Sequence, residues 1–451
     1  MLSAVKNYNL QYKSIIALGI PIIIGQLGNI VTGFADTIMV GQHSTEELAA
    51  ASFVNNVINA FIVIGTGFSF SIIPMLGEGL AKKNYHAMGG WLKNSVAANM
   101  TTTVFIMLIL AAIFMNIDML GQPEELMPLI RPYYIVTFMS VVFVMLANSF
   151  RQFVEGIGNP SVSMWILLSG NILNIIGNYI LIYGKFGAPE LGLYGAGIST
   201  LTSRIIMFLM FLIVYLKRDS YAHYREGFVS TPLTKKAWRQ LNALGWPIAI
   251  QQGLEAGTFC ITAIMVGWLG YMQLAAHQIV ITISTISFTT YLGLGSAVAI
   301  RASYFKGMND WTMVRNITMA GIHLALVVML VVCLSLFLLQ DYLGFIFTDD
   351  VRVNDIVKTI LPILMLYQLG DCIQIILTNA LRGLADVKTI MCISFVAYFV
   401  IAIPCGYLCG FPFGMGIAGI WLAYPIGFVC SVFLLGMRMK RLIGMNMNKT
   451  I

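Results

Sequence analysis

The chain has 451 residues, of which 58% are hydrophobic and only 10% are charged, and this balance excludes an ordinary soluble globular protein. The net charge of +7 does not indicate a nucleic-acid partner, because the basic residues are spread over many short segments rather than gathered in one patch. We therefore expect an integral membrane protein that contacts lipids and binds no nucleic acid.

Apolar stretches follow one another along the whole chain. Each has about 20 residues or more, enough for a helix to cross roughly 30 Å of hydrocarbon. The first run, from Ile15 to Val40, lacks a small-residue cleavage pattern, so we expect it to remain as helix one rather than to be removed as a signal peptide. The composition thus predicts an all-α membrane protein with no soluble domain. The twelve predicted spans are 16–40, 50–77, 91–116, 128–150, 161–184, 192–216, 241–267, 273–300, 317–340, 356–380, 388–410 and 415–437.

The basic residues are sorted by loop. If successive loops alternate between the two sides, all but five of the 26 basic residues fall on the side of both termini. Four of the exceptions lie on the opposite side, and the fifth, Arg204, lies within a span, where the sequence offers it no firm partner. The positive-inside rule then places both termini in the cytoplasm. The four residues on the opposite side are Arg131, Lys185, Arg352 and Lys358.

The two halves of the chain repeat the same motifs. A shift of 226 residues aligns residues 17–22 (ALGIPI) with residues 243–248 (ALGWPI), and the same shift aligns residues 38–41 with residues 264–267, both IMVG. Because six helices separate equivalent points, both halves cross the membrane in the same direction. We expect them to be related by a pseudo-two-fold axis along the membrane normal.

The longest polar connection lies near the middle of the chain. It predicts an N-terminal six-helix lobe at 1–220, a cytoplasmic linker at 221–240 and a C-terminal six-helix lobe at 241–451. Duplicated halves could equally serve a transporter, a channel or a membrane enzyme. The repeat alone therefore leaves the function open.

Three of the 19 carboxylates fall within the predicted spans, namely Asp36, Glu255 and Asp371. A carboxylate near the bilayer centre costs roughly 2.5–3.5 kcal/mol, so it is expected to face protein or water and to have a partner. Such an acid can exchange H⁺, Na⁺ or an organic cation within one cavity, although a buried structural hydrogen bond is the alternative. Tyr367 lies one helical turn before Asp371, so two acids and a phenol can line one pocket.

Asp36 has candidate partners on helix five. Asn171, Asn174 and Asn178 recur there at spacings of three and four, which places three amides on one helix face. Amide and carboxylate oxygens are hard ligands for a small cation, and Thr200 on helix six can add a hydroxyl. Hydrogen bonding between helices is the alternative explanation of this polar stripe.

Several short motifs occur along the chain. They are the run from Pro21 to Gly41 that contains Asp36, Gly245-Trp246-Pro247 followed by Glu255, Leu274 to Gln278, Tyr367 to Asp371, and Leu381-Arg382-Gly383. Each motif alone is weak, but together they are specific. They resemble the multidrug and toxic compound extrusion family, and its NorM branch in particular, over essentially the whole chain.

This resemblance implies a secondary active transporter without enzyme activity or cofactor, a monomer in the bacterial inner membrane. It implies export of amphiphilic organic cations in exchange for Na⁺ or H⁺ by alternating access. Where relatives have an acid on helix five, this chain has Asn178. The implied cation site of the second lobe is Glu255, Tyr367 and Asp371, with Glu255 and Asp371 as Na⁺ ligands, and the implied polar cluster of the first lobe is Asp36, Asn174, Asn178 and Thr200.

Three other functions are open to a polytopic membrane protein with these features. A flippase for lipid-linked oligosaccharides shares this fold but is expected to have several basic residues for pyrophosphate, and here Arg204 is the only candidate. A membrane-embedded transferase needs clustered carboxylates for Mg²⁺, whereas Asp349 and Asp350 lie in an outer loop with no second acidic pair nearby. A channel needs no asymmetric acid sites in two lobes.

Overall fold

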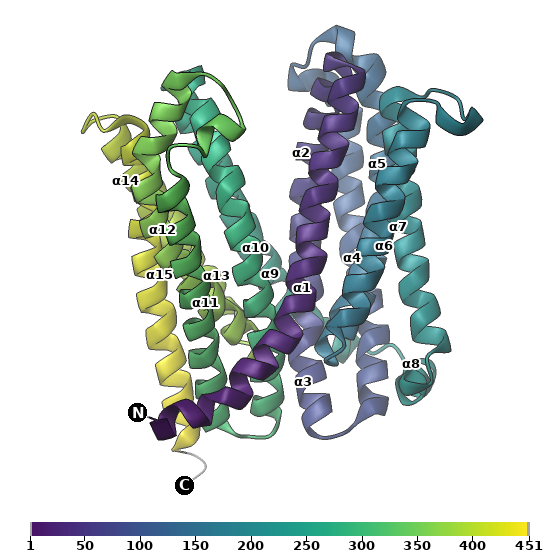
Figure 1. Ribbon diagram of the computed structural model, residues 1–451. Coiled ribbons are helices and arrows are strands. Elements are labelled where there is room, and N and C mark those ends of the chain that lie inside the picture. Colours follow the sequence, from purple (N-terminus) through teal and green to yellow (C-terminus); the bar gives the residue numbers. More distant parts are fainter. Residues whose placement is uncertain (1, 449–451) are drawn as a thin grey trace. The chain divides into compact units, whose positions relative to one another are not determined.

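The computed structural model describes residues 2–448, and almost all of them are helical (Figure 1). In this described part, twelve spans are long and apolar enough to cross a membrane. The predicted all-α architecture with twelve membrane helices is therefore confirmed. The spans are α1 (Leu2–His43), α2 (Thr45–Ser69) continued by α3 (Ile73–Ala81), α4 (Tyr85–Met115), α5 (Met127–Gly156), α6 (Pro160–Ile182), α7 (Gly192–Lys217), α9 (Lys235–Gly267), α10 (Tyr271–Gly307), α11 (Trp311–Leu339), α12 (Val351–Gly383), α13 (Val387–Phe395) continued by α14 (Ile403–Gly410), and α15 (Gly416–Met447).

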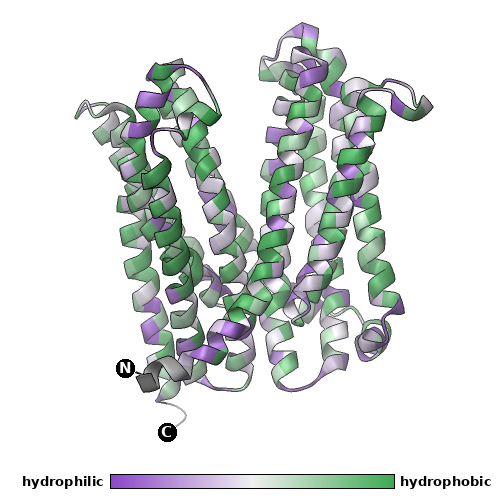
Figure 2. Cartoon of the chain, viewed as in Figure 1, coloured by the Kyte–Doolittle hydropathy of each residue, from purple (hydrophilic) through white to green (hydrophobic). Residues whose placement is uncertain are grey.

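Local sequence signals fix many of the helix boundaries. Helices α2, α4 and α11 follow Ser44, Asn84 and Asp310, whose side chains each accept a backbone N–H three residues further on. Hydrophobic residues dominate the helices, and hydrophilic residues gather at the connections between them (Figure 2). These caps and connections divide the apolar sequence into separate spans.

The chain forms two compact units. Unit 1 contains the chain up to Ile23 and from Ile250 onward, and unit 2 contains Ile24–Ala249. Helices α1 and α9 therefore each contribute residues to both units. The lobes predicted at 1–220 and 241–451 follow the sequence duplication rather than this grouping, and that division stays a prediction.

The two shared helices divide at equivalent points of the repeat. The shift of 226 residues places Ile23 on Ala249, and it places Pro21, inside α1, on Pro247, inside α9. A proline in a helix interior removes one backbone hydrogen bond and crowds the preceding turn, so a helix can bend there. Each proline lies two residues before the point where its helix passes from one unit to the other.

Unit 1 is built around α10 and α12, which pack along each other, with α11 and α15 alongside α12. The first part of α1 belongs to this unit. Its Ile15 is fully buried in the same apolar cluster as Tyr291, and the Tyr12 hydroxyl lies 2.9 Å from Nδ1 of His323. These contacts tie the beginning of the chain to its second half.

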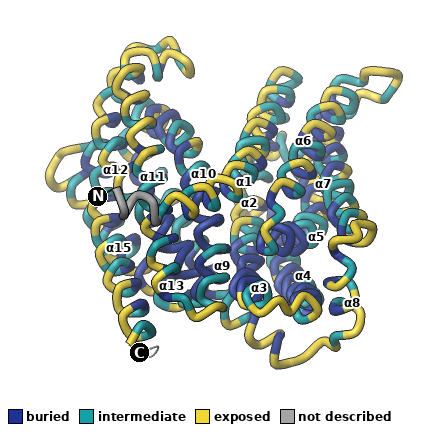
Figure 3. Tube along the Cα trace, turned by 60° about the horizontal axis from the view of Figure 1, so that its bottom comes forward, coloured by how far each residue is buried: buried dark blue, intermediate teal, exposed yellow. Residues whose placement is uncertain are grey.

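Unit 2 is built around α5, which packs against α2, α4 and α7, while α6 packs along α7. Its buried residues lie mainly between these helices, and its loops are largely exposed (Figure 3). The predicted cytoplasmic linker contains a further helix, α8 (Ala222–Ser230), which packs on α4. This contact depends on two glycines, because a Cβ at Gly89 would meet the carbonyl oxygen of Tyr224, and one at Gly227 would meet that of His86.

The ends of two spans differ from prediction. Helix α5 extends to Gly156 and buries Arg151 and Glu155, which pair at 2.7 Å, so the prediction of only three carboxylates within the spans is wrong. Arg382, expected in a loop, is buried in α12, so Arg204 is not the only arginine within a span. In both cases polar partners offset the free-energy cost of burying the charged side chain. A span predicted from a run of apolar residues ends too early here, because the charged residue interrupts the run.

Candidate functional site

Unit 1 brings the three predicted second-lobe residues together. Tyr367 and Asp371 lie one turn apart on α12, and each is only 1% exposed. Glu255 on α9 is half-buried and near enough to interact electrostatically with both of them. We refer to these three residues as the second-lobe cluster.

Both carboxylate oxygens of Glu255 accept hydrogen bonds. Oε1 accepts from the Tyr398 hydroxyl at 3.2 Å, and Oε2 accepts from Nε2 of Gln251 at 3.1 Å. Gln374 donates to the Tyr398 hydroxyl at 2.5 Å, and Arg382 donates to Oε1 of Gln251. Two donors, Gln251 of α9 and Tyr398 between α13 and α14, therefore fix the orientation of the Glu255 carboxylate. Side chains of α12 hold both donors in place.

Tyr398 lies in a π-helical segment, Val396–Ala402, between α13 and α14. Pro404 follows this segment within α14. A proline ring crowds the carbonyl four residues earlier, and one widened turn relieves that contact. Sequence reasoning missed Tyr398, although a proline inside an apolar span is a signal of a local departure from regular helix.

Tyr367, one turn before the buried Asp371 on α12, packs within an aromatic cluster. The Tyr367 ring lies 5.0 Å from that of Phe428, 5.7 Å from that of Tyr424 and 6.2 Å from that of Trp421, measured between centroids. Within the described chain, Oδ2 of Asp371 is buried and accepts no hydrogen bond. A carboxyl group in such surroundings needs a proton or a cation to offset the loss of hydration.

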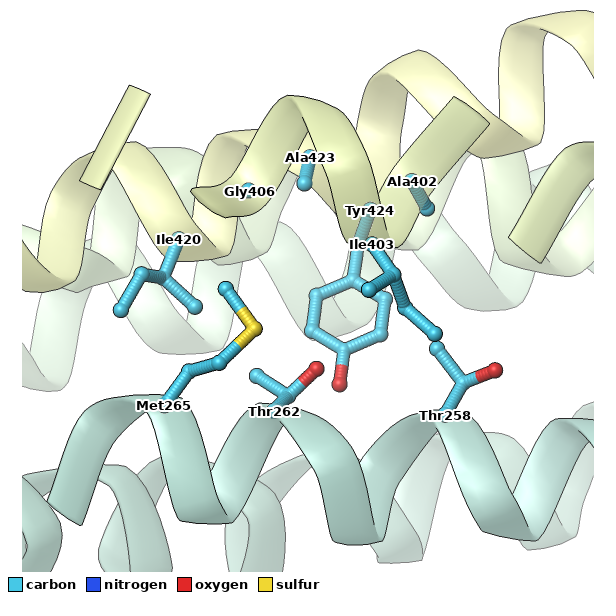
Figure 4. Close-up of a pocket in the computed structure, with 9 residues that line it drawn as sticks. All are labelled: Thr258, Thr262, Met265, Ala402, Ile403, Gly406, Ile420, Ala423 and Tyr424. Carbon is cyan, nitrogen blue, oxygen red and sulfur yellow. The ribbon is translucent and has the colours of Figure 1, made fainter. Parts of the chain in front are cut away.

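A small pocket lies beside this cluster, one turn further along α9. Its cavity volume is about 10 Å³, room for one water molecule rather than for an organic cation. The Tyr424 hydroxyl points toward Thr262 across it (Figure 4). The pocket can therefore hold a water molecule but not a drug-sized molecule. It is lined by Thr258, Thr262, Met265, Ala402, Ile403, Gly406, Ile420, Ala423 and Tyr424.

Unit 2 connects the four predicted first-lobe residues by hydrogen bonds. Nδ2 of Asn178 donates to Oδ1 of Asp36 at 2.5 Å and to Oδ1 of Asn174 at 3.5 Å. Asn174 in turn donates to the Thr200 hydroxyl at 3.3 Å. We refer to Asp36, Asn174, Asn178 and Thr200 as the first-lobe cluster; Asn171 instead donates to Asn29 on α1.

The two clusters provide different chemistry. The first-lobe cluster contains one carboxylate, and the second-lobe cluster contains two and a phenol. No group of three or more His, Cys, Asp or Glu side chains arranged for a metal ion occurs in residues 2–448. Ion binding at either cluster would therefore use carboxylate oxygens together with amide, hydroxyl or phenol oxygens, a donor set suited to hard cations.

A family model and individual sequence relatives of this chain agree on one protein family. The MatE family model matches residues 21–180 and 247–408. The chain is 27% identical to the multidrug resistance protein NorM of Photobacterium profundum and 28% identical to the multidrug resistance protein MdtK of Proteus mirabilis. Each alignment covers 96% of both chains.

Solved structures share the fold. A multidrug resistance MATE family transporter of the MOP superfamily, in an outward-facing conformation, matches with a TM-score of 0.88 at 19% identity, covering 97% of each chain. The eukaryotic MATE transporter AtDTX14 matches with a TM-score of 0.86 at 17% identity, covering 98% of this chain and 100% of its own. The twelve-helix architecture is thus common to proteins of low sequence identity.

Proposed function

Because this chain belongs to the MatE family of multidrug efflux transporters, we propose that it exports amphiphilic organic cations in exchange for Na⁺ or H⁺ by alternating access. The family places it among transporters rather than enzymes, and twelve apolar helices and its bacterial relatives point to a multi-pass inner-membrane protein. We further propose that it works as a monomer with both termini in the cytoplasm. The termini include residues 1 and 449–451, which lie outside the described residues.

The second-lobe cluster is the observation that carries this proposal. Asp371 is buried with one carboxylate oxygen that accepts no hydrogen bond from the described residues, and Glu255 lies within its electrostatic reach while staying half-buried. Arg382 lies within electrostatic reach of Glu255 and can balance one of the two charges. The second acid still needs a counter-charge, so a proton, Na⁺ or an organic cation at this cluster would replace one another. Exchange at shared oxygens is the chemistry that an antiporter requires.

We propose that the coupling ion binds at the second-lobe cluster rather than at the first-lobe cluster. Na⁺ favours several oxygen ligands and at least one full negative charge. Glu255, Asp371 and Tyr367 supply two carboxylates and a phenol, whereas Asp36 supplies the single carboxylate of the first-lobe cluster. The second-lobe cluster is therefore expected to bind Na⁺ more tightly.

The experiment is efflux of a fluorescent organic cation from proteoliposomes in which a Na⁺ gradient and a pH gradient are imposed separately. Wild-type protein should export the dye under at least one gradient, and Asp371→Asn should abolish gradient-driven export. Asp355→Asn is the matched control, because Asp355 is exposed on the same helix, α12. Export that needs no gradient, or that persists unchanged in Asp371→Asn, would contradict the proposal.

A further inference from the structure

A histidine and two acids meet where α1 ends. His43 is the last residue of α1, and its Nδ1 lies 2.8 Å from Oε2 of Glu47 on α2. Its Nε2 lies 3.1 Å from Oε1 of Glu190, in the connection between α6 and α7. All three residues belong to unit 2. We refer to them as the His43 clamp, because the imidazole joins the end of α1 and the start of α2 to the connection that precedes α7.

The backbone around the clamp leaves room for these side chains. Gly192, which begins α7, has a φ of +52°, and a Cβ at this position would collide with Oε1 of Glu47. The backbone N–H of Leu191 donates to the carbonyl oxygen of Leu181 at 2.9 Å and closes the connection between α6 and α7. The acid that this connection carries is therefore presented to the end of α1 by an ordered backbone.

The positions of the two acids favour a charged imidazole. A neutral histidine has one donor nitrogen and one acceptor nitrogen, so it can donate to only one of two carboxylates, and its remaining lone pair would face an oxygen. The protonated ring donates to both carboxylates and places a positive charge between two negative ones. Histidine side chains change charge between about pH 5 and 8, so a contact of this kind can form and break near neutral pH.

Neighbouring ionisable residues do not form ion pairs with the clamp in the described part of the chain. The Tyr183 ring lies 6.2 Å from the imidazole, and its hydroxyl donates to a backbone carbonyl of α1 at 2.8 Å. Lys185 is exposed and forms no ion pair within residues 2–448. Glu46 is exposed and accepts from the hydroxyl of Ser44. The positive charge between the two acids of the clamp is therefore that of His43.

We propose that the His43 clamp is a regulatory proton site, in which protonated His43 holds the end of α1 against the α6–α7 connection and loss of the proton releases it. Asp36 of the first-lobe cluster lies about two turns earlier on α1, so the clamp restrains the helix that carries this acid. A closed clamp stabilises this arrangement of α1, and any rearrangement of the helix then costs more free energy. With the proposed topology the clamp faces the outside, so external acid slows export; this last step rests on the proposed efflux function.

The first test measures backbone amide hydrogen exchange of purified full-length protein in nanodiscs at about pH 5 and about pH 8, corrected for the intrinsic pH dependence of exchange. The peptide that contains Leu191 reports on the connection. His43→Gln removes the charge, and His43→Arg keeps a positive charge at both pH values with a fork that can reach two acids. His223→Gln is the matched control, because His223 is an exposed histidine that lies 3.7 Å from Glu226 in the linker.

We expect the Leu191 peptide of the wild-type protein to exchange up to about fivefold faster at the higher pH, the size of an exposed ion pair. Exchange should be fast at both pH values in His43→Gln and slow at both in His43→Arg, while His223→Gln should behave as the wild type. Wild-type exchange that does not change with pH, or a pH dependence that persists in His43→Arg, would overturn the inference.

The second test measures efflux of a fluorescent organic cation from cells that express each protein, at the same two external pH values. His43→Gln should export faster than the wild type at the lower pH, and His43→Arg should export more slowly than the wild type at the higher pH. A pH effect of equal size in all three proteins would overturn the regulatory role of the clamp. Failure of the wild-type protein to export at either pH would instead count against the efflux function, while the exchange ratio still decides whether the clamp opens with pH.

Discussion

Replacement of Tyr398 by phenylalanine separates ion binding from packing at the second-lobe cluster. The change removes the hydroxyl that donates to Glu255 at 3.2 Å and accepts from Gln374 at 2.5 Å. The ring remains and keeps its contact with Phe428, 6.2 Å away between centroids. Loss of stability should come mainly from the amide group of Gln374, which is left without its acceptor, at about 1–3 kcal/mol.

The change is also expected to weaken ion binding. A hydrogen bond to a charged group contributes about 1.5–3 kcal/mol, and a bond of 3.2 Å belongs at the lower end of that range. Since 1.4 kcal/mol corresponds to a factor of about ten, Tyr398→Phe should weaken Na⁺ binding roughly tenfold by destabilising the ionised form of Glu255.

Isothermal titration calorimetry of purified protein with Na⁺ measures this effect directly, and thermal unfolding monitors the fold. Tyr407→Phe is the matched control, because Tyr407 lies on the neighbouring α14 and is 49% exposed. Unchanged Na⁺ affinity in a folded Tyr398→Phe variant would refute the role assigned to this hydroxyl. An equal loss in Tyr407→Phe would show that the effect is not local.

Three further predictions concern pairing, coupling and topology. Glu155→Gln should destabilise the protein by about 3–5 kcal/mol, seen as a lower thermal midpoint, because it leaves Arg151 buried without its partner; an unchanged midpoint would show that the pair is dispensable. The Glu255→Gln, Asp371→Asn double variant should export dye scarcely worse than either single variant, since the two acids act on one ion, and additive losses would indicate separate roles. Cysteines introduced in the segment 217–240 should not react with impermeant thiol reagents added to intact cells, whereas labelling there would place the segment outside.

Composition and the length of the apolar stretches predict the twelve membrane helices. A helix needs about 20 apolar residues to cross the hydrocarbon core, whatever the chemistry of the site. The predicted spans end before α5 and α12 do, because Arg151 and Arg382 interrupt the apolar pattern. Both arginines are nevertheless buried, and each has a polar hydrogen-bond partner. The division of α1 between two units was also not predicted. It depends on which helix faces meet, and a one-dimensional pattern of hydrophobicity does not record this.

The candidate site was only partly predictable. Asp371 stands out because a carboxylate inside an apolar span is rare. Tyr398 and Gln251, which hold Glu255, do not stand out, because tyrosine and glutamine occur in membrane helices for many structural reasons. Ser140 likewise does not stand out in the sequence. Only the structure shows that its hydroxyl accepts a hydrogen bond from Arg204 of α7.

Na⁺ titration of the wild-type protein, Asp36→Asn and Asp371→Asn at two pH values decides whether the ion binds at the second-lobe cluster. Na⁺ and H⁺ compete for the same oxygens, so apparent Na⁺ affinity should rise as pH rises in the wild-type protein. Asp36→Asn should weaken transport yet leave Na⁺ binding measurable. Asp371→Asn should abolish Na⁺ binding. Na⁺ binding that survives Asp371→Asn but vanishes in Asp36→Asn would show that the ion binds at the first-lobe cluster instead.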